Sequence, residues 1–284
     1  MDAAGQLIAR LPPWLGQPAA RALTGGHAWL TELRLKAGRN VLLYGRTGCK
    51  KLSELSGAAA PTEEQLRTLL LELSDHSLAA RTAELENGYL TLSGGHRAAV
   101  CGNVINGRVM RVSSLNIRVA RQVLHCGAPL YRLIDSRRSI LLAGPVASGK
   151  TTVLRDLARY AASAPHWYRT AIVDERREIA AMADGLPQLD VGEASDILDG
   201  VSRRRGFSMA IRTLAPDYIV CDEIGSADDL AAIRLARLSG CQTLATLHAG
   251  ERSLPDDITG YFDCVAFLGA GEQAGKIKEI RENS

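Results

Sequence analysis

Residues 139–151 read SILLAGPVASGKT, a short apolar run followed by a glycine-rich turn and a lysine. The part from Gly144 to Thr151 satisfies the phosphate-loop pattern G-x-x-x-x-G-K-[ST] in full. The apolar run predicts a buried strand, and a helical pattern begins at about Thr151, which is the context that separates a phosphate loop from a chance match. The alternative is a plain glycine-rich turn between a strand and a helix. The stretch therefore predicts an α/β domain that binds a nucleotide.

The residue types of this loop suit a phosphate ligand. Glycines let successive backbone N–H groups curl around a phosphate, and the N-terminus of the following helix adds a partial positive charge. We expect Lys150 to reach the β- and γ-phosphates of ATP and the hydroxyl of Thr151 to bind Mg²⁺. The predicted nucleotide-binding residues are Gly144, Pro145, Val146, Ala147, Ser148, Gly149, Lys150, Thr151 and Thr152.

The apolar runs of the chain change in character near residue 124, which predicts two domains. Three further runs without polar alternation follow the phosphate loop, over 170–173, 218–221 and 242–245. Strands of this kind are buried on both faces, so residues 125–284 predict a doubly wound α/β domain with a mostly parallel sheet. Residues 1–124 predict an α+β domain with frequent glycine breaks.

The N-terminal domain contains one clear helix signal. Thr62 and Gln65 have the spacing of a capping box, which predicts a helix that opens at about Pro61. Its expected apolar stripe consists of Leu66, Leu69, Leu70 and Leu73. Short strands are expected over 31–35, 41–44, 89–92, 98–101 and 109–112.

The size and composition of the chain limit its class. Its 284 residues, 46% hydrophobic and 23% charged, are typical of a globular protein with two domains rather than of a disordered one. The net charge of +3 is too small to hold a polyanion by bulk charge, and 5% aromatic residues argue against a base-stacking surface. No apolar run approaches the about 18 residues of a membrane span, and no secretory leader is visible. We therefore expect a cytoplasmic protein.

An acidic pair follows the run over 218–221. A buried strand would deliver Asp222 and Glu223 to the carboxyl edge of the sheet, beside the phosphate loop, where ligands bind in open α/β sheets. Asp222 is expected to hold Mg²⁺ through water, and Glu223 to orient or deprotonate an attacking water. The alternative is that the pair only marks the N-terminus of a helix.

Two more strand ends carry candidate residues at the same edge. Glu175 lies in the charged segment 174–178, and it either positions water or metal or belongs to a solvated turn. His248 ends the run that begins at 242, and it either senses the γ-phosphate or water, or has a structural role.

In this order, the phosphate loop, the acidic segment 174–178, Asp222-Glu223 and Thr246-x-His248 resemble the secretion-type RecA-fold ATPases that power type II and type IV secretion and pili. A closer resemblance, over most of the chain, is to the stage III sporulation protein AA family of endospore-forming bacteria. The resembling segments are ELRLKAGRN (32–40), GYLTLSGGHRAAVCG (88–102), SSLNIRVARQV (113–123), VDERREIA (173–180), AIRTLAPDYIVCDEIG (210–225) and TLHAG (246–250). Export relatives typically carry Gly-Glu in place of Asp222-Glu223, so the metal site is expected to be closer to that of other RecA-like hydrolases.

The resemblance implies a Mg²⁺-dependent ATPase with a RecA-like second domain and a homo-oligomeric, hexameric assembly. In secretion ATPases the N-terminal domain closes over the nucleotide. The resemblance also implies a place at the mother-cell face of the forespore membrane, reached through membrane proteins of the same sporulation operon, where the ATPase energises a channel between the two cells. No direct nucleic-acid partner is expected.

Several arginines are candidates for contact with nucleotide phosphates or with another subunit. Arg97, Arg118 and Arg121 lie in resembling N-terminal segments, and secretion ATPases use such arginines against nucleotide phosphates, a task that suits the permanently charged guanidinium. Ordinary ion pairing is the alternative, and Arg97 and Arg118 are retained as catalytic candidates. The run over 203–205 is expected to be a solvated helix face, with a subunit contact as the alternative.

Two other functions remain open on sequence grounds. A RecA-like core also drives nucleic-acid motors, although the small net charge argues against one. A nucleotide-gated scaffold with little turnover is a further alternative. A small-molecule kinase is the least favoured reading, because no segment resembles a substrate-binding lid.

Overall fold

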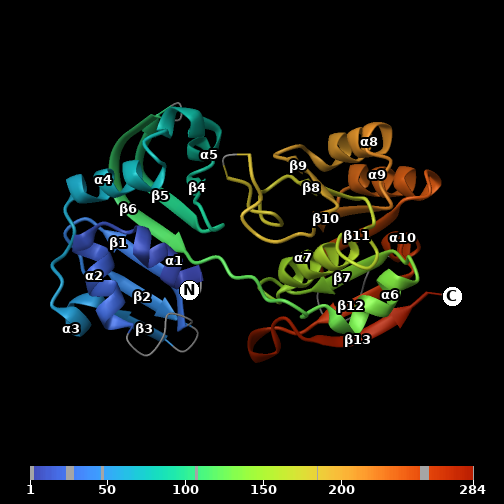
Figure 1. Cartoon of the computed structure of the whole chain (residues 1–284), viewed down its shortest axis with the longest axis horizontal. Helices are drawn as coiled ribbons and strands as arrows, with labels where there is room; N and C mark the ends of the chain where they lie inside the picture. Colours follow the sequence, from blue (N-terminus) through green and yellow to red (C-terminus); the bar gives the residue numbers. More distant parts are fainter. Residues whose placement is uncertain are drawn as a thin grey trace. The chain divides into compact units, whose positions relative to one another are not determined.

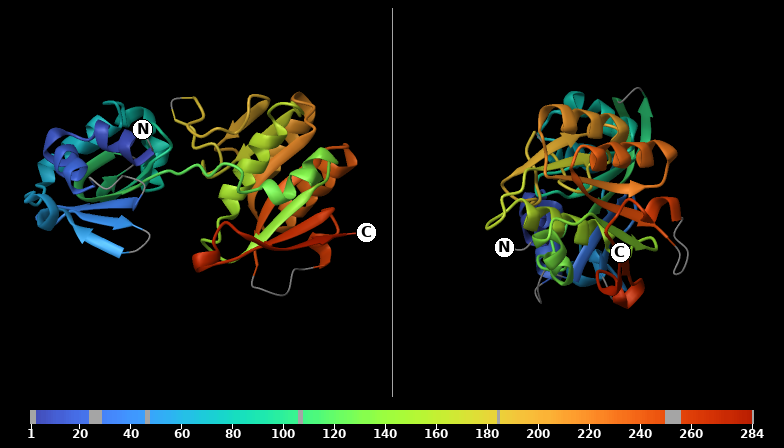
Figure 2. Two further views of the ribbon diagram at one scale, coloured as in Figure 1. Left: turned by 60° about the horizontal axis from the view of Figure 1, so that its bottom comes forward. Right: turned by 90° about the vertical axis from the view of Figure 1, so that its right-hand side faces the viewer.

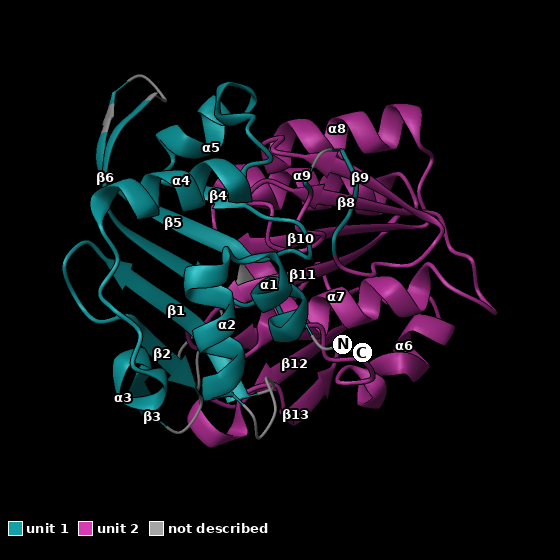
Figure 3. Ribbon diagram, turned by 60° about the vertical axis from the view of Figure 1, so that its left-hand side comes forward, with its two compact units in different colours: residues 1–121, 183–188 teal, residues 122–182, 189–284 magenta. Residues whose placement is uncertain are grey.

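The computed structural model describes residues 3–23, 29–45, 48–105, 108–183, 185–249 and 256–283. The chain forms two compact units (Figure 3). Unit 1 contains residues 1–121 and 183–188, and unit 2 contains residues 122–182 and 189–284. Residues 183–188 thus join unit 1 although they lie between two strands of unit 2. Within unit 1, the side chain of Gln188 accepts a 2.8 Å hydrogen bond from the backbone N–H of Gly94.

Unit 1 is built on an antiparallel sheet with the strand order β3-β2-β1-β6-β5-β4 (Figure 1). The strands are β1 (Leu30–Lys36), β2 (Leu42–Gly45), β3 (Gly48–Lys51), β4 (Tyr89–Thr91), β5 (Arg97–Ile105) and β6 (Arg108–Arg118). The helices are α1 (Ala3–Arg10), α2 (Pro13–Ala22), α3 (Leu52–Ser56), α4 (Glu63–Leu73) and α5 (Thr82–Glu86). The sequence pattern predicted five of these strands and helix α4, whereas β3 and the helices α1, α2, α3 and α5 were not predicted.

Helix α4 begins where its capping signal predicted. The hydroxyl of Thr62 accepts from the N–H of Gln65, and the side chain of Gln65 accepts from the N–H of Thr62. The four leucines of its predicted stripe are buried in the single hydrophobic cluster of unit 1. A local polar signal and a helical apolar period agree here, so both predictions are confirmed.

Unit 2 is built on a sheet with the order β13-β12-β7-β11-β10-β8-β9. The strands are β7 (Ile140–Gly144), β8 (Thr170–Asp174), β9 (Ser195–Asp199), β10 (Tyr218–Ile224), β11 (Gln242–His248), β12 (Cys264–Leu268) and β13 (Ile277–Glu282). All neighbours are parallel except β12 and β13. This confirms the mostly parallel α/β prediction and the four strands that carry it, whereas β9, β12 and β13 were not predicted.

Helices cover both faces of this sheet (Figures 1 and 2). They are α6 (Tyr131–Asp135), α7 (Lys150–Ala161), α8 (Arg203–Thr213), α9 (Ala227–Leu238) and the short α10 (Asp256–Thr259). Ile140 and Leu142 of β7 pack in a cluster with α6 and α7, whereas Leu141 and Ala143 pack in a second cluster with α8 and α9. Alternate residues of one strand point to opposite faces, so an uninterrupted apolar run fits a sheet covered on both sides.

The longest described helices, α7 and α9, have 12 residues each. In the described part of the chain, no helix has the length and hydrophobicity needed to cross a membrane.

Candidate nucleotide-binding site

The carboxyl ends of four neighbouring strands form the site in unit 2. The sheet places β7, β11, β10 and β8 side by side in this order, and each ends in a segment that the sequence singled out. These segments are the phosphate loop, residues 246–248, the pair Asp222-Glu223 and the acidic segment 174–178. Gly250, which ends one resembling segment, lies outside the described residues. The structure therefore brings together the predicted site residues of unit 2.

The phosphate loop holds Lys150 in a buried position at the start of α7. The ammonium Nζ donates to the carbonyl oxygens of Gly144 at 2.9 Å and Pro145 at 2.8 Å, and it lies 3.1 Å from Nδ1 of His248. Burial lowers the pKa of Lys150, and the carboxylates of nearby acidic residues oppose this shift. The carbonyl oxygens of Gly144 and Pro145 thus hold the positive charge of Lys150 inside the phosphate loop.

Gly149 has to be glycine for two reasons. Its φ of +87° lies in the left-handed region, and a Cβ there would lie 2.8 Å from the nitrogen of Gly275. The same Gly275 donates a 2.7 Å hydrogen bond to the carbonyl of Ser148. The turn between β12 and β13, which the sequence pattern did not predict, therefore packs directly on the phosphate loop.

The other loop residues differ in exposure. Val146 is 77% exposed, whereas Ser148 is fully buried and its Oγ has no hydrogen-bond partner within the described residues. Pro145 and Ala147 complete the turn, and Thr152 follows in the first turn of α7.

Thr151 joins the phosphate loop to β10. Its Oγ1 donates a 2.6 Å hydrogen bond to Oδ2 of Asp222. A hydroxyl and a carboxylate are oxygen ligands of the kind that Mg²⁺ prefers, and protein Mg²⁺ sites of this type are completed by substrate phosphates and water. No cluster of three or more His, Cys, Asp or Glu side chains suited to a metal occurs in the part of the chain that the structure describes. Thr151 and Asp222 are therefore the side chains of this site that could hold a Mg²⁺ ion.

The acidic pair lies in a β-bulge. Cys221 pairs with Ala245 and Ile224 with Leu247, so Asp222 and Glu223 of β10 together face the single residue Thr246 of β11. Such an irregularity re-aims the side chains of the bulged strand. Glu223 has a φ of 54°, a left-handed conformation that costs a residue with a side chain about 1–2 kcal/mol.

Thr246 holds the bulge, a role that no pattern in the sequence indicated. Its fully buried Oγ1 accepts a 2.8 Å hydrogen bond from the N–H of Glu223 and donates to Oδ1 of Asp222. The N–H of Glu223 also lies 3.0 Å from Oδ1 of Asp222. One hydroxyl thus contacts both residues of the acidic pair.

The carboxylate of Glu223 is held by two basic side chains. His248 Nε2 lies 2.9 Å from Oε1, and Arg176 Nη1 forms an ion pair with Oε2. Burial acts to raise the pKa of Glu223, but the hydrogen bond from His248 and the nearby positive charges outweigh it and lower the pKa. Because Lys150 can only donate to Nδ1 of His248, the neutral imidazole carries its proton on Nε2 and donates it to Glu223. Lys150, His248 and Glu223 therefore form one hydrogen-bonded chain.

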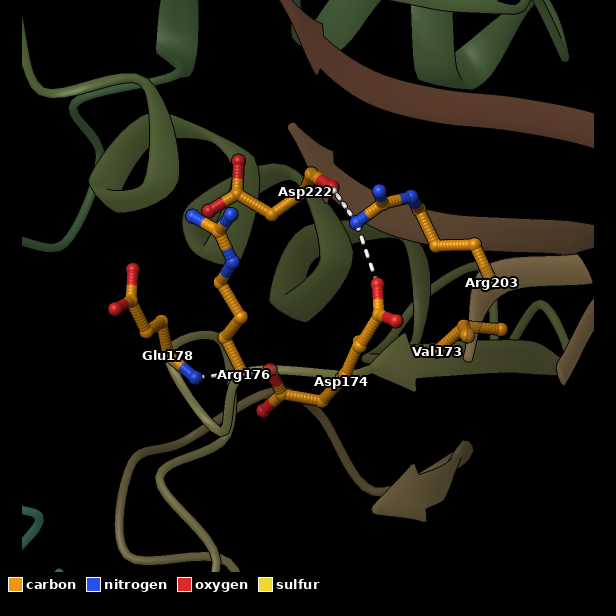
Figure 4. Close-up of a pocket in the computed structure, with 7 residues that line it drawn as sticks. Val173, Asp174, Arg176, Glu178, Arg203 and Asp222 are labelled. Carbon is orange, nitrogen blue, oxygen red and sulfur yellow. Dashed lines mark hydrogen bonds and ion pairs between the residues drawn. The ribbon is translucent and has the colours of Figure 1, made fainter. Parts of the chain in front are cut away.

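Glu175 is held by an arginine of α8. Arg203 Nη1 lies 2.7 Å from Oε2 of Glu175, and Nε donates a 2.7 Å bond to Oδ1 of Asp229. In Figure 4 the guanidinium of Arg203 also points toward the end of β10, where it lies 3.4 Å from the carbonyl of Asp222. The expectation of a solvated helix face is therefore wrong for Arg203, although Arg204 is exposed as expected. A charged run does not show which of its members turns inward.

The acidic segment after β8 is shaped by buried polar groups. The carboxylate of Asp174 accepts hydrogen bonds from the N–H groups of Glu178, Ile179 and Ala180. The buried Arg155 of α7 donates to the carbonyls of Ile179 and Glu178. These hydrogen bonds hold the segment in a fixed conformation beside the site, although Arg176 remains exposed, and the pocket of Figure 4 lies against it.

The arginine candidates of the N-terminal segments belong to unit 1. Arg97 and Arg118 lie directly opposite each other on β5 and β6. The guanidinium of Arg97 lies 3.6 Å from the ring centroid of Tyr89, and Arg118 is exposed at 3.7 Å from Glu32. Arg121 donates a 2.7 Å hydrogen bond to the carbonyl of Leu30.

A protein family and a curated relative match most of this chain. The model of the family described as "Sporulation stage III, protein AA" matches residues 24–281. Stage III sporulation protein AA of Bacillus subtilis (strain 168) is 38% identical over 232 residues, which cover 78% of this chain and 74% of that protein.

Two solved structures share the fold. The Legionella pneumophila ATPase DotB has a TM-score of 0.59 at 14% identity, over 90% of this chain and 76% of that chain. The pilus retraction motor PilT with bound ADP has a TM-score of 0.61 at 16% identity, over 84% of this chain and 74% of that chain. These likenesses confirm the RecA-like fold of the secretion ATPases.

Proposed function

Because this chain belongs to the sporulation stage III protein AA family, we propose that it binds and hydrolyses ATP as a secretion-type ATPase during sporulation. The observation that carries the proposal is the 2.6 Å contact between Thr151 and Asp222. It joins the phosphate loop to the acidic pair, which a simple glycine-rich turn does not require. The fold shared with an ATPase and with an ADP-bound motor supports the same activity.

ATP binds through its phosphates. The loop over 144–152 surrounds the β- and γ-phosphates with backbone N–H groups, and Lys150 supplies a fixed positive charge. Thr151 and Asp222 would hold Mg²⁺, which when bound would neutralise developing charge on the phosphate oxygens. Glycine at position 149 lets the loop take its left-handed turn against Gly275.

Glu223 orients the attacking water. Its lowered pKa keeps the carboxylate ionised at neutral pH, which makes it a good hydrogen-bond acceptor but a weak base. Orientation is therefore favoured over full removal of a proton. His248 links the Glu223 carboxylate to Lys150 through hydrogen bonds. A phosphate that binds Lys150 therefore changes the hydrogen bonding of Glu223 through His248. Glu175 contributes by holding Arg203 next to the end of β10.

We propose in addition that the protein acts as an assembly at a membrane. The N-terminal domain, residues 1–124, closes over the nucleotide and offers Arg97 and Arg118 to its phosphates. The chain assembles as a homo-oligomer, most simply a hexamer. It works in the cytoplasm at the mother-cell face of the forespore membrane, where it docks on membrane proteins of the same operon and energises assembly or operation of a channel. The family membership supports this setting.

The isosteric substitution Glu223→Gln tests the chemistry. We expect ATP binding within about threefold of wild type and a kcat reduced by about 100-fold or more, the range for loss of a positioned acid–base group. Glu64→Gln on the exposed surface of α4 makes the same change away from the site and is expected to leave kcat unchanged. Steady-state hydrolysis and calorimetric nucleotide binding measure both quantities. Unchanged hydrolysis in Glu223→Gln would remove Glu223 from its assigned role.

A further inference from the structure

Thr246 lies at the one place where both members of the acidic pair can be held by a single group. Two residues of β10 face one residue of β11 here, and that residue carries a hydroxyl. A hydroxyl donates one hydrogen bond and accepts others. Thr246 uses both capacities: it accepts from the N–H of Glu223 at 2.8 Å and donates to Oδ1 of Asp222.

These contacts determine where the two carboxylates point. Oδ1 of Asp222 is engaged by Thr246, which leaves Oδ2 directed at Thr151, 2.6 Å away. The N–H of Glu223 is tied to Thr246 while its φ is 54°, a conformation that persists in a residue with a side chain only where surrounding contacts hold it. The side chain of Glu223 then reaches His248, two residues beyond Thr246 on the same strand.

We propose that Thr246 is a positioning residue for ATP hydrolysis: its hydroxyl fixes the bulge that aims Asp222 at the metal and Glu223 at the attacking water. This inference rests on the proposed ATPase function and deepens it. Thr246 is fully buried behind the two carboxylates, so it acts through Asp222 and Glu223 and not by contact with the nucleotide.

Two substitutions separate the hydroxyl from the shape of the side chain. Thr246→Val keeps the branched shape and removes the hydroxyl, whereas Thr246→Ser keeps the hydroxyl. Thr243→Val makes the same change on the same strand at a residue that is 2% exposed and pairs with Ile219, three residues before Asp222. It is the matched control for a valine in the core.

The experiment measures kcat and KM for ATP, the affinity for a fluorescent ATP analogue with and without Mg²⁺, and the melting temperature of the full chain. For Thr246→Val we expect a kcat reduced by about 10- to 100-fold, which corresponds to loss of hydrogen bonds that involve a charged group. We expect a Mg²⁺-free affinity within about threefold of wild type, a Mg²⁺-dependent gain in affinity reduced by about tenfold, and a KM for ATP in the presence of Mg²⁺ raised by a similar factor. Thr246→Ser is expected to restore kcat to within about threefold, and Thr243→Val to match wild type.

Either of two results would overturn the proposal. One is a Thr246→Val variant with kcat and Mg²⁺ dependence within twofold of wild type. The other is a Thr246→Ser variant that loses as much as Thr246→Val, since the hydroxyl would then not be the cause. A wild-type chain without hydrolysis would count against the proposed ATPase function instead. The role of Thr246 would then be decided by a crystal structure of Thr246→Val, in which an unchanged bulge with the same Asp222 and Glu223 contacts refutes it.

Discussion

Acidification is expected to destabilise unit 1 through one buried histidine. His96 precedes β5 and is 1% exposed, and its Nδ1 accepts a 3.0 Å hydrogen bond from the N–H of Ala120. Its Nε2 has no hydrogen-bond partner among the described residues. Protonation at Nδ1 would break the bond to Ala120 and leave a charge in the core. Burial, assisted by the positive charge of Arg10, therefore lowers the pKa of His96 to about 4.

The size and sign of the effect follow from proton linkage. Between pH 6.5 and about 4 the unfolded chain binds a proton at His96 and the folded chain does not, so the free energy of unfolding falls as the pH falls. At about 1.4 kcal/mol for each pH unit, the full difference amounts to about 3 kcal/mol. The contribution of the neutral His96 to the free energy of unfolding is complete above pH 6.5 and is lost by about pH 4.

Tryptophan fluorescence can follow unit 1 within the full chain. Trp14 and Trp29 pack against the core of unit 1, and Trp167 is the third tryptophan of the sequence, in unit 2. Urea unfolding of a Trp167→Phe background is compared with the same background carrying His96→Asn, which does not titrate and keeps an acceptor near the position of Nδ1. Between pH 6.5 and 4.5 the parent is expected to lose most of this 3 kcal/mol in excess of the variant.

Proton NMR of the histidine rings measures the same quantity directly. The signal that is absent from His96→Asn is expected to titrate near pH 4. A titration near pH 6.5, or equal losses of stability in parent and variant, would refute the assignment of this pH dependence to His96.

Two substitutions at the site are expected to act through packing and electrostatics. Arg203→Ala removes the ion-pair partner of Asp229, whose side chain is only 5% exposed. We expect the free energy of unfolding to fall by about 2–3 kcal/mol. This is less than the about 3–5 kcal/mol lost when a fully buried pair is broken, because the side chain of Arg203 is 19% exposed. Urea denaturation measures the change, and a loss under about 0.5 kcal/mol would place the contact among ordinary surface ion pairs. Gly149→Ala is expected to reduce nucleotide affinity by at least about tenfold, because its Cβ would meet the nitrogen of Gly275 at 2.8 Å at a φ of +87°. Gly57→Ala in unit 1, at a φ of +70° with nothing within 4 Å, introduces backbone strain away from the phosphate loop and is expected to leave ATP affinity unchanged. Calorimetric titration showing equal ATP affinity in both variants would contradict this expectation.

Local patterns predicted much of the fold. The phosphate loop, its flanking strand and helix, and the capping box of α4 each depend on residues only a few positions apart. The strands of unit 2 that carry the site were recognisable because strands buried on both faces are apolar throughout. The C-terminal strands β12 and β13 were missed, and with them the contact of Gly275 on the phosphate loop.

The site was predicted as a set of residues but not as an arrangement. Arg176 and Arg203 belong to charged runs, where the pattern does not distinguish solvated members from those that pair with Glu223 or Glu175. Thr246 was noted only as part of a resembling motif. Its role depends on a bulge, and a bulge arises from the register between two strands rather than from the composition of either.

The amino-acid sequence by itself determined the fold class, the place of the phosphate loop and the strand ends at which its partners stand, because these features are carried by short-range spacing. Only the tertiary structure decided that Thr151 meets Asp222, that one threonine holds both acidic residues, and that His248 links Lys150 to Glu223. Each of these contacts joins different strands or helices. Their geometry depends on strand order, register and backbone conformation, which are set by the packing of the whole sheet.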